Sequence, residues 1–163
     1  MDHLWSPWRF RYVSTAGKTE GCVFCRKSAE TNDRSNLIVH RAAHCFVILN
    51  LFPYTTGHLM VVPYAHVATL EEATPETLEE MMRLTRLSSN HLKSTYHWSG
   101  LNIGMNVGEC AGAGIAGHLH MHVLPRWPGD VNFMTSIGET RILPEDLETT
   151  FEKLASLFRH TPI

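Results

Sequence analysis

Three histidines alternate with apolar residues in the run His118-Leu119-His120-Met121-His122. Side chains alternate between the two faces of a β-strand, so a strand here places the three imidazoles on one face and the apolar residues on the other. Successive imidazoles are then roughly 7 Å apart, close enough to serve one ligand. Histidine is a rare amino acid in proteins generally, although this chain has 11. An alternating triple is therefore improbable by chance and favours a chemical role over an exposed polar strand face.

Two chemical roles fit this triple. A three-histidine metal site is one, but no Asp or Glu lies close in the sequence to orient the imidazoles. Nucleophilic catalysis on phosphorus is the other, because a neutral imidazole attacks phosphorus while its neighbours donate hydrogen bonds to phosphate oxygens. The Gly/Ala-rich segment 111–117 leads directly into the run, and its backbone N–H groups can approach an anion closely. This segment precedes a strand, so it is neither a P-loop nor a dinucleotide fingerprint, but it favours the phosphate interpretation.

A second motif is the pair Cys22 and Cys25, two of the 4 cysteines in the chain. Such a pair fits half of a zinc site, a redox pair or two buried thiols. A redox pair begins a helix in a thioredoxin-like unit, which the sequence does not predict. The cysteines are too few for the disulfide framework of a small secreted protein, so we expect a cytoplasmic location.

Hydrophobic patterns predict the elements that position these motifs. Five strands are predicted, over Leu37–His40, Cys45–Asn50, His58–Pro63, Leu101–Val107 and His118–Leu124. An amphipathic helix is predicted from Pro75 to about Tyr96, with Thr74 as its N-cap, and a C-terminal helix follows from Pro144 onward. Strands in hairpins and one segregated long helix predict an α+β fold with a mainly antiparallel sheet.

Size and charge exclude several classes of protein. The 163 residues, 44% of them hydrophobic, fit a single domain over residues 1–163, with 1–20 as an aromatic N-terminal extension. A balance of 14 basic and 16 acidic residues, net charge -2, argues against duplex nucleic acid or an anionic membrane as partner. No segment reaches the roughly 18 apolar residues that span a bilayer. The other histidines are expected at the surface, namely His40, His44, His91, His97 and His160.

The chain resembles a known superfamily. Residues 118–124 have the form His-φ-His-φ-His-φ-φ, where φ is apolar, which resembles the signature of the histidine-triad (HIT) superfamily of nucleotide hydrolases and transferases. Residues 50–63 are similar to its nucleotide-binding segment, and residues 101–130 to its catalytic half. Residues 4–9 and 125–134 resemble a prokaryotic group commonly assigned as diadenosine tetraphosphate phosphorylases. The resemblance implies a HIT-like fold of about five strands and a homodimer whose sheets join across subunits.

The resemblance also implies roles for individual residues. His120 matches the nucleophile that accepts the α-phosphate as a nucleotidyl-histidine, and His122 and His58 match histidines that contact phosphate oxygens. Asn50 matches the residue that binds the ribose hydroxyls. Further positions match contacts to phosphate, leaving group or base, namely Asn106, Gly114, Ile115 and Trp127. Because the side chain at 115 is apolar here, only the backbone of the 114–115 segment can bind phosphate.

In zinc-bearing relatives the cysteine pair is completed by two histidines, which match His66 and His118. Two thiolates and two imidazoles form a closed tetrahedral shell, so this zinc is structural. Catalysis then needs no protein-bound metal, although magnesium is expected to accompany a polyphosphate substrate.

The resemblance therefore implies nucleotidyl transfer from a dinucleoside polyphosphate such as diadenosine tetraphosphate, through a covalent intermediate on His120, to phosphate or water. Two alternatives stay open. One is a hydrolase of nucleoside phosphoramidates or aminoacyl-adenylates with the same fold. The other is a nucleotide-binding regulatory module with little turnover.

Overall fold

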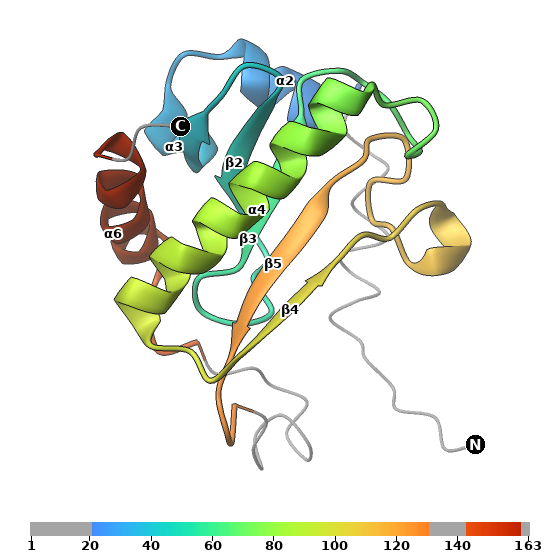
Figure 1. Ribbon diagram of the computed structural model, residues 1–163. Helices are drawn as coiled ribbons and strands as arrows, with labels where there is room; N and C mark the ends of the chain where they lie inside the picture. The colour runs from blue at the N-terminus through green and yellow to red at the C-terminus, as the bar shows by residue number, and fades with distance from the viewer. Residues whose placement is uncertain (1–20, 131–142, 161–163) are drawn as a thin grey trace, which may run out of the picture.

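A five-stranded antiparallel sheet forms the centre of the protein, which the computed structural model describes over residues 21–130 and 143–160 (Figure 1). Its strands are β1 (Ile38–Arg41), β2 (Cys45–Leu49), β3 (Leu59–Pro63), β4 (Gly100–Gly104) and β5 (Met121–Arg126). They lie in the order β1-β2-β3-β5-β4, and each neighbouring pair is antiparallel. The predicted α+β class and antiparallel sheet are therefore confirmed, and β5 lies between β3 and β4.

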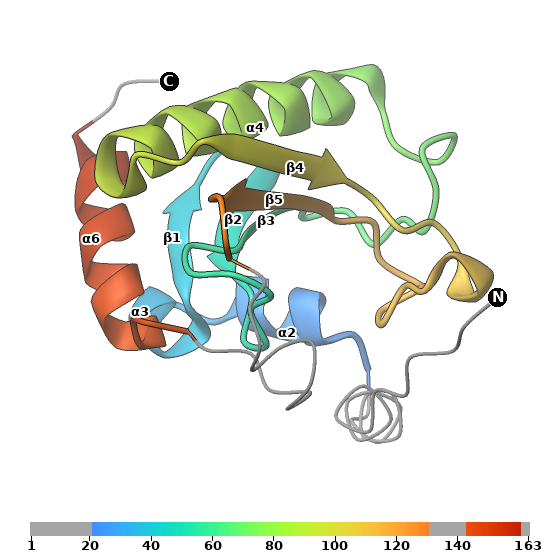
Figure 2. The same ribbon diagram turned by 90° about the horizontal axis from the view of Figure 1, so that it is seen from below.

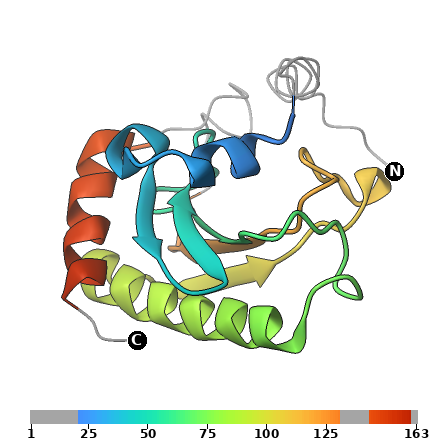
Figure 3. The same ribbon diagram turned by 90° about the horizontal axis from the view of Figure 1, so that it is seen from above.

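Helices cover both faces of this sheet. The long helix α4 (Pro75–Tyr96) lies across one face, and the short helix α2 (Val23–Ala29) lies across the other (Figures 2 and 3). Helix α6 (Leu147–Arg159) packs against β1 and α4, while α3 (Asp33–Asn36) follows α2 and contacts β1. A single 3₁₀ turn, η1 (Glu109–Ala111), lies between β4 and β5.

Two apolar clusters correspond to the two faces. The larger one joins residues of the sheet to α4 and α6, and includes Val61, Val123, Leu84 and Phe158. The smaller one joins the opposite face to α2 through Phe24, which is 2% exposed and packs with sheet residues. Close packing on both faces fixes the register of the inner strands, because a slip of one residue would move every side chain into the opposite cluster, where its size and shape do not match its neighbours.

The predicted long helix is confirmed. The Thr74 side chain accepts a hydrogen bond from the Thr77 backbone N–H at 3.3 Å, and Pro75 occupies the first turn, where its missing N–H costs nothing. The helix ends at Tyr96, and its C-cap, His97, adopts a left-handed conformation with φ of 49°. Its carboxyl end lies near residues that follow β5, because Trp127 Nε1 donates to the Tyr96 carbonyl.

Four elements differ from the sequence-based expectation. Helices α2 and α3 were not predicted, since a helix of 7 residues with one buried side chain shows little periodicity. Strand β4 ends at Gly104 and β5 begins at Met121, so both strands are shorter than expected. The alternation of the histidine run nevertheless persists before β5, since Leu119, like Met121 and Val123, lies in the larger cluster.

The expectation that the remaining histidines lie at the surface is wrong for His91. Its side chain is only 8% exposed, and its ring lies edge-on to Phe158 of α6 with centroids 4.6 Å apart. His40 of β1 is half-buried and stacks on Phe158 at 5.2 Å. Packing of α6 against β1 and α4 covers both rings, and nothing local in the sequence predicts this contact.

The expected aromatic extension, residues 1–20, lies outside the described residues, as do residues 131–134 of the 125–134 segment. Among the residues that are described, no helix combines the length and the apolar character needed to cross a membrane.

Candidate active site

Histidines in and next to two strands meet where β3 and β5 pair. His58 directly precedes β3, and the register of the two strands places His122 opposite Met60. His118 and His120 lie in the segment that leads into β5. His58, His118 and His120 are 1%, 1% and 5% exposed, so the sheet holds these imidazoles almost out of water.

The hydrogen bonds of His58 and His122 determine which of their ring nitrogens carry protons. The Tyr54 backbone N–H donates to His58 Nδ1 at 3.2 Å, so this nitrogen carries no proton. In the neutral ring the proton then lies on His58 Nε2, which donates to His122 Nδ1 at 2.8 Å. His122 Nδ1 is therefore an acceptor, and the N–H of the neutral His122 ring is at Nε2.

His120 is oriented by its own backbone neighbour. Its Nδ1 lies 2.8 Å from the carbonyl oxygen of His118. A carbonyl only accepts, so Nδ1 carries the proton and donates it. The lone pair of the neutral ring is consequently on Nε2, the nitrogen that points away from the main chain.

Burial favours the neutral form of the His120 and His122 rings. Removal from water lowers the pKa of His120, although the hydrogen bond to His118 acts in the opposite direction. Burial, together with the repulsion that a charge on His120 would add, lowers the pKa of His122 to about 4. At neutral pH His120 and His122 are therefore uncharged imidazoles, the form that a nucleophile or a hydrogen-bond donor to phosphate needs.

Two aromatic residues that sequence reasoning missed complete the packing around the imidazoles. The Tyr54 ring lies 4.8 Å from the His58 ring and 6.2 Å from the His122 ring, between centroids. On the other side, the Phe24 ring lies 5.2 Å from His120. Phe24 stands between the two cysteines of the motif, and Tyr54 lies four residues before His58. Their closeness in sequence to these site residues is the signal that could have identified them.

Asn50 is buried beside His58. Its Oδ1 accepts from the Phe52 backbone N–H at 3.0 Å, and its Nδ2 lies 3.3 Å from His58 Nδ1. Its own backbone N–H donates to the His58 carbonyl at 3.0 Å. The structure therefore brings Asn50 into the histidine cluster, where binding of a ribose stays a prediction.

Of the other predicted contact residues, three lie in the segments between β4 and β5, and Trp127 lies beyond the far end of β5. Asn106 follows β4, and Gly114 and Ile115 lie in the half-buried turn that precedes the histidine run. The Ile115 side chain packs against the cluster that contains Phe24, which leaves its backbone as the polar group. Trp127 follows the far end of β5, roughly 16 Å along the strand from His122, and donates from Nε1 to the Tyr96 carbonyl at 3.1 Å.

The four predicted metal ligands come together next to this site. The ligand atoms of Cys22, Cys25, His66 and His118 all lie within 4.8 Å of one another. His118 Nδ1 is 3.2 Å from Cys22 Sγ and 3.2 Å from His66 Nδ1, and Cys25 Sγ is 3.3 Å from His66 Nδ1. Contacts of this length are expected between donors that share one tetrahedral ion.

His118 is prepared to act as a ligand. Its Nε2 lies 2.9 Å from the Pro63 carbonyl and must donate to it, which places the lone pair on Nδ1, the atom that faces the thiols. Burial also lowers the pKa of His118, so the ring is neutral as a metal ligand must be. A carbonyl behind a ligating imidazole is the usual outer partner in such sites. The donor set therefore fits a metal ion of the zinc type.

Comparisons with known proteins agree with this geometry. The family model described as the HIT domain matches residues 31–129. An "AP-4-A phosphorylase" of Mycobacterium tuberculosis (strain ATCC 25618 / H37Rv) is 36% identical over 169 residues, covering 99% of this chain and 87% of that protein. "Protein hit" of Bacillus subtilis (strain 168) is 28% identical, over 83% of this chain and 93% of the relative.

Among solved structures, a Zn-bound histidine triad family protein from Mycobacterium smegmatis superposes with a TM-score of 0.68. It is 28% identical, and the match covers 85% of this chain and 94% of that one. The extent of the family match and the shared fold show that this chain belongs to the HIT family.

The lowered pKa of His122 predicts a pH dependence of stability. Between pH 6.5, the ordinary pKa, and about 4, the unfolded chain binds more protons than the folded protein, so stability falls as pH falls through this window. In His122→Gln the loss of unfolding free energy between pH 7 and pH 5 is expected to be smaller than in wild type by about 2 kcal/mol.

Denaturant titrations at the two pH values measure this difference. The metal ligands are the same in both proteins, so their contribution cancels. His44→Gln, at an exposed position, is the control and should keep the wild-type dependence. Equal losses in wild type and His122→Gln would contradict the assignment.

Proposed function

We propose that this protein transfers a nucleotidyl group from a dinucleoside polyphosphate through a covalent intermediate on His120. The observation that carries the proposal is the hydrogen bond from His120 Nδ1 to the His118 carbonyl at 2.8 Å, which leaves the lone pair of the neutral ring on Nε2. The relative named AP-4-A phosphorylase, 36% identical over 99% of the chain, supports diadenosine tetraphosphate as the substrate.

The first step forms a bond from His120 Nε2 to the α-phosphorus and breaks the bond from that phosphorus to the leaving polyphosphate oxygen. His122, whose Nδ1 accepts from His58 at 2.8 Å, directs Nε2–H toward phosphate oxygens and stabilises the charge that develops there. In the second step an acceptor oxygen attacks the same phosphorus, and the nitrogen–phosphorus bond breaks. The lone pair returns to His120 Nε2.

The surrounding residues take supporting roles in this proposal. Asn50, next to His58 in the folded chain, binds the ribose hydroxyls. The backbone of Gly114 and Ile115 binds phosphate, and Asn106 contacts phosphate or the leaving group. A base contact by Trp127, homodimer formation and magnesium bound with the substrate stay predictions from the resemblance, and a cytoplasmic location stays a prediction from the cysteine content.

We also propose that Cys22, Cys25, His66 and His118 hold a structural zinc ion. Four protein ligands leave no position for water or substrate, so the ion would contribute to folding energy and to the rigidity of the segment before β5. The similar structure from M. smegmatis is described as Zn-bound, which supports the choice of metal.

Product analysis tests the reaction. With diadenosine tetraphosphate and inorganic phosphate we expect ATP and ADP, because phosphate attacks the adenylyl-histidine. AMP and ATP formed without phosphate would identify a hydrolase instead. If no nucleoside phosphoanhydride, phosphoramidate or aminoacyl-adenylate is turned over, the enzymatic proposal is wrong and a binding module is the better interpretation.

Covalent labelling tests the nucleophile. His120→Ala should lose all labelling by a radioactive adenylyl donor, and its turnover should fall by a factor of roughly 10³ or more. His44→Ala, which removes an exposed imidazole, should label like wild type. Label retained on folded His120→Ala would show that another side chain forms the intermediate.

Metal analysis tests the zinc site. The purified wild-type protein should contain about one zinc ion per chain, and Cys22→Ser should reduce this content strongly because a closed four-ligand shell loses a thiolate. Cys110→Ser, at an exposed cysteine outside the cluster, should retain the metal. A wild-type protein without metal would reject the site.

A further inference from the structure

Helix α2 and its N-cap carry the two thiols of the candidate metal site, but the helix has few stabilising interactions of its own. It is 7 residues long, and its N-cap, Cys22, makes no side-chain capping hydrogen bond. A helix this short is not stable alone, since nucleation costs more than its few hydrogen bonds return. The positions of Cys22 and Cys25 must therefore be set by contacts outside the helix.

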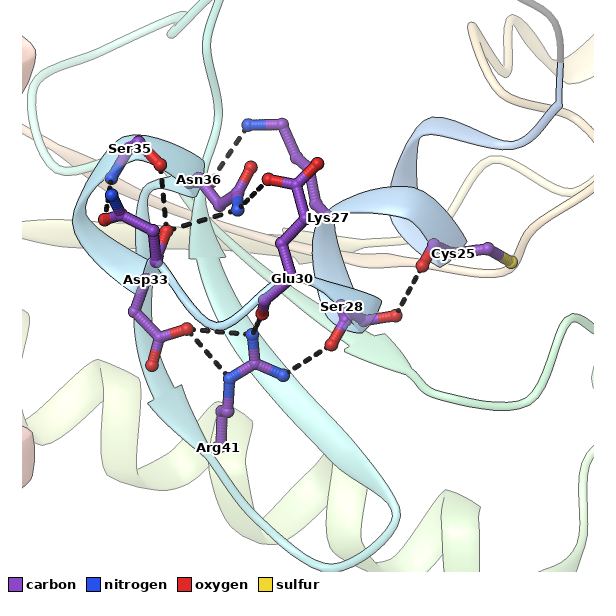
Figure 4. A network of polar contacts seen from close by, with 9 residues as sticks. Cys25, Lys27, Ser28, Glu30, Asp33, Ser35, Asn36 and Arg41 are labelled. Carbon is purple, nitrogen blue, oxygen red and sulfur yellow. Dashed lines mark hydrogen bonds and ion pairs between the residues drawn. The ribbon is translucent and has the colours of Figure 1, made fainter.

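Arg41 of β1 supplies such contacts at the carboxyl end of α2 (Figure 4). Its guanidinium donates to the Ser28 carbonyl and to the Glu30 carbonyl, both at 2.7 Å. Its Nε donates to Asp33 Oδ1 of α3 at 2.8 Å. The last carbonyls of a helix have no partner within the helix, and a planar fork of donors satisfies them in one fixed arrangement.

A further hydrogen bond links this end of the helix to a thiol residue. The Ser28 hydroxyl donates to the Cys25 carbonyl at 3.0 Å, so Arg41, Ser28 and Cys25 form one chain of contacts (Figure 4). On the neighbouring side, Lys27 donates to the Asn36 carbonyl at 2.9 Å, and the Asn36 amide donates to Glu30 Oε2 at 2.7 Å. These bonds hold α2 and α3 together on β1.

The other end of α2 meets the candidate active site. Cys22 Sγ lies 3.2 Å from His118 Nδ1, and the Phe24 ring lies 5.4 Å from the His118 ring and 5.2 Å from the His120 ring. Ligand distances in a metal site hold to within about 0.2 Å. A small displacement of α2 therefore weakens the metal shell and removes the ring that packs on His120.

We propose that Arg41 is a positioning residue for the metal cluster, whose guanidinium fixes the end of α2 so that both thiols face His118. The inference rests on the proposed zinc site and adds a residue that supplies no ligand atom. Lysine cannot replace it, because an ammonium is a point charge and does not span two carbonyls and a carboxylate in one plane.

Zinc affinity in the full-length protein tests the proposal. We expect Arg41→Met and Arg41→Lys to bind zinc about 10-fold to 100-fold more weakly than wild type in competition with a chelator, the range seen when outer partners of metal sites are lost. In the cobalt-substituted protein, the thiolate-to-cobalt absorption should also change, because the ligand geometry relaxes.

Arg34→Met is the matched control. Arg34 is a nearby arginine on α3, and it pairs with Glu148 and Glu152 of α6 rather than with α2. It should keep wild-type zinc affinity and the wild-type cobalt spectrum. An equal loss in Arg34→Met would mean that the effect is a general loss of stability, and the proposal would fail.

The remaining outcomes are also decisive. Wild-type affinity in folded Arg41→Met overturns the proposal. If that variant does not fold, Arg41→Lys takes its place, since it keeps the positive charge but loses the fork that reaches the Ser28 and Glu30 carbonyls, and unchanged zinc affinity there is equally negative. A wild-type protein that binds no zinc refutes the metal site itself, and this failure is visible before any variant is made.

Discussion

The hydrogen bond from His120 Nδ1 to the carbonyl of His118 joins the two halves of the site. His118 is itself held at three points, by the Pro63 carbonyl behind Nε2, by the thiols in front of Nδ1, and by Phe24 against its ring. Whatever fixes His118 therefore also fixes the donor and acceptor sides of His120. The proposed metal ligand His118 and the proposed nucleophile His120 are two residues apart and share this hydrogen bond. A metal ion that held His118 rigidly would therefore also orient the His120 ring.

The second pair of imidazoles depends on sheet register. His58 and His122 are 64 residues apart in sequence, and only the antiparallel pairing of β3 with β5 places their nitrogens 2.8 Å apart. Packing on both faces of the sheet then protects this register, since a slip of one residue would move each side chain to the opposite face, where it would not fit its new neighbours. The same burial lowers the pKa of His122 and keeps it neutral. Core packing and site chemistry thus share one cause.

Helix α2 shows how a minor element acquires importance. It contributes one ring to the core and two thiols to the cluster, and it is fastened at its carboxyl end to β1 through Arg41. Edge strand β1 therefore has a part in the geometry of β5, on the other side of β2 and β3. The contact of α6 with β1 extends this support to the C-terminal helix.

Local sequence determined much of this protein. The alternation of residues 118–123, the capped helix over 75–96 and the strands around it follow from periodicity and capping, which act between near neighbours. The metal cluster was expected only because the chain resembles a family, since the spacing of Cys22 and Cys25 fits three kinds of site.

Tertiary structure decided the rest. It set the tautomers of His58, His118 and His120, because each depends on a carbonyl or amide supplied by the folded backbone. It buried His91 and placed Trp127 at the end of β5 away from His122, and it formed α2 through contacts with Arg41 and the sheet. These features depend on contacts between residues far apart in the chain, and local sequence patterns do not predict such contacts.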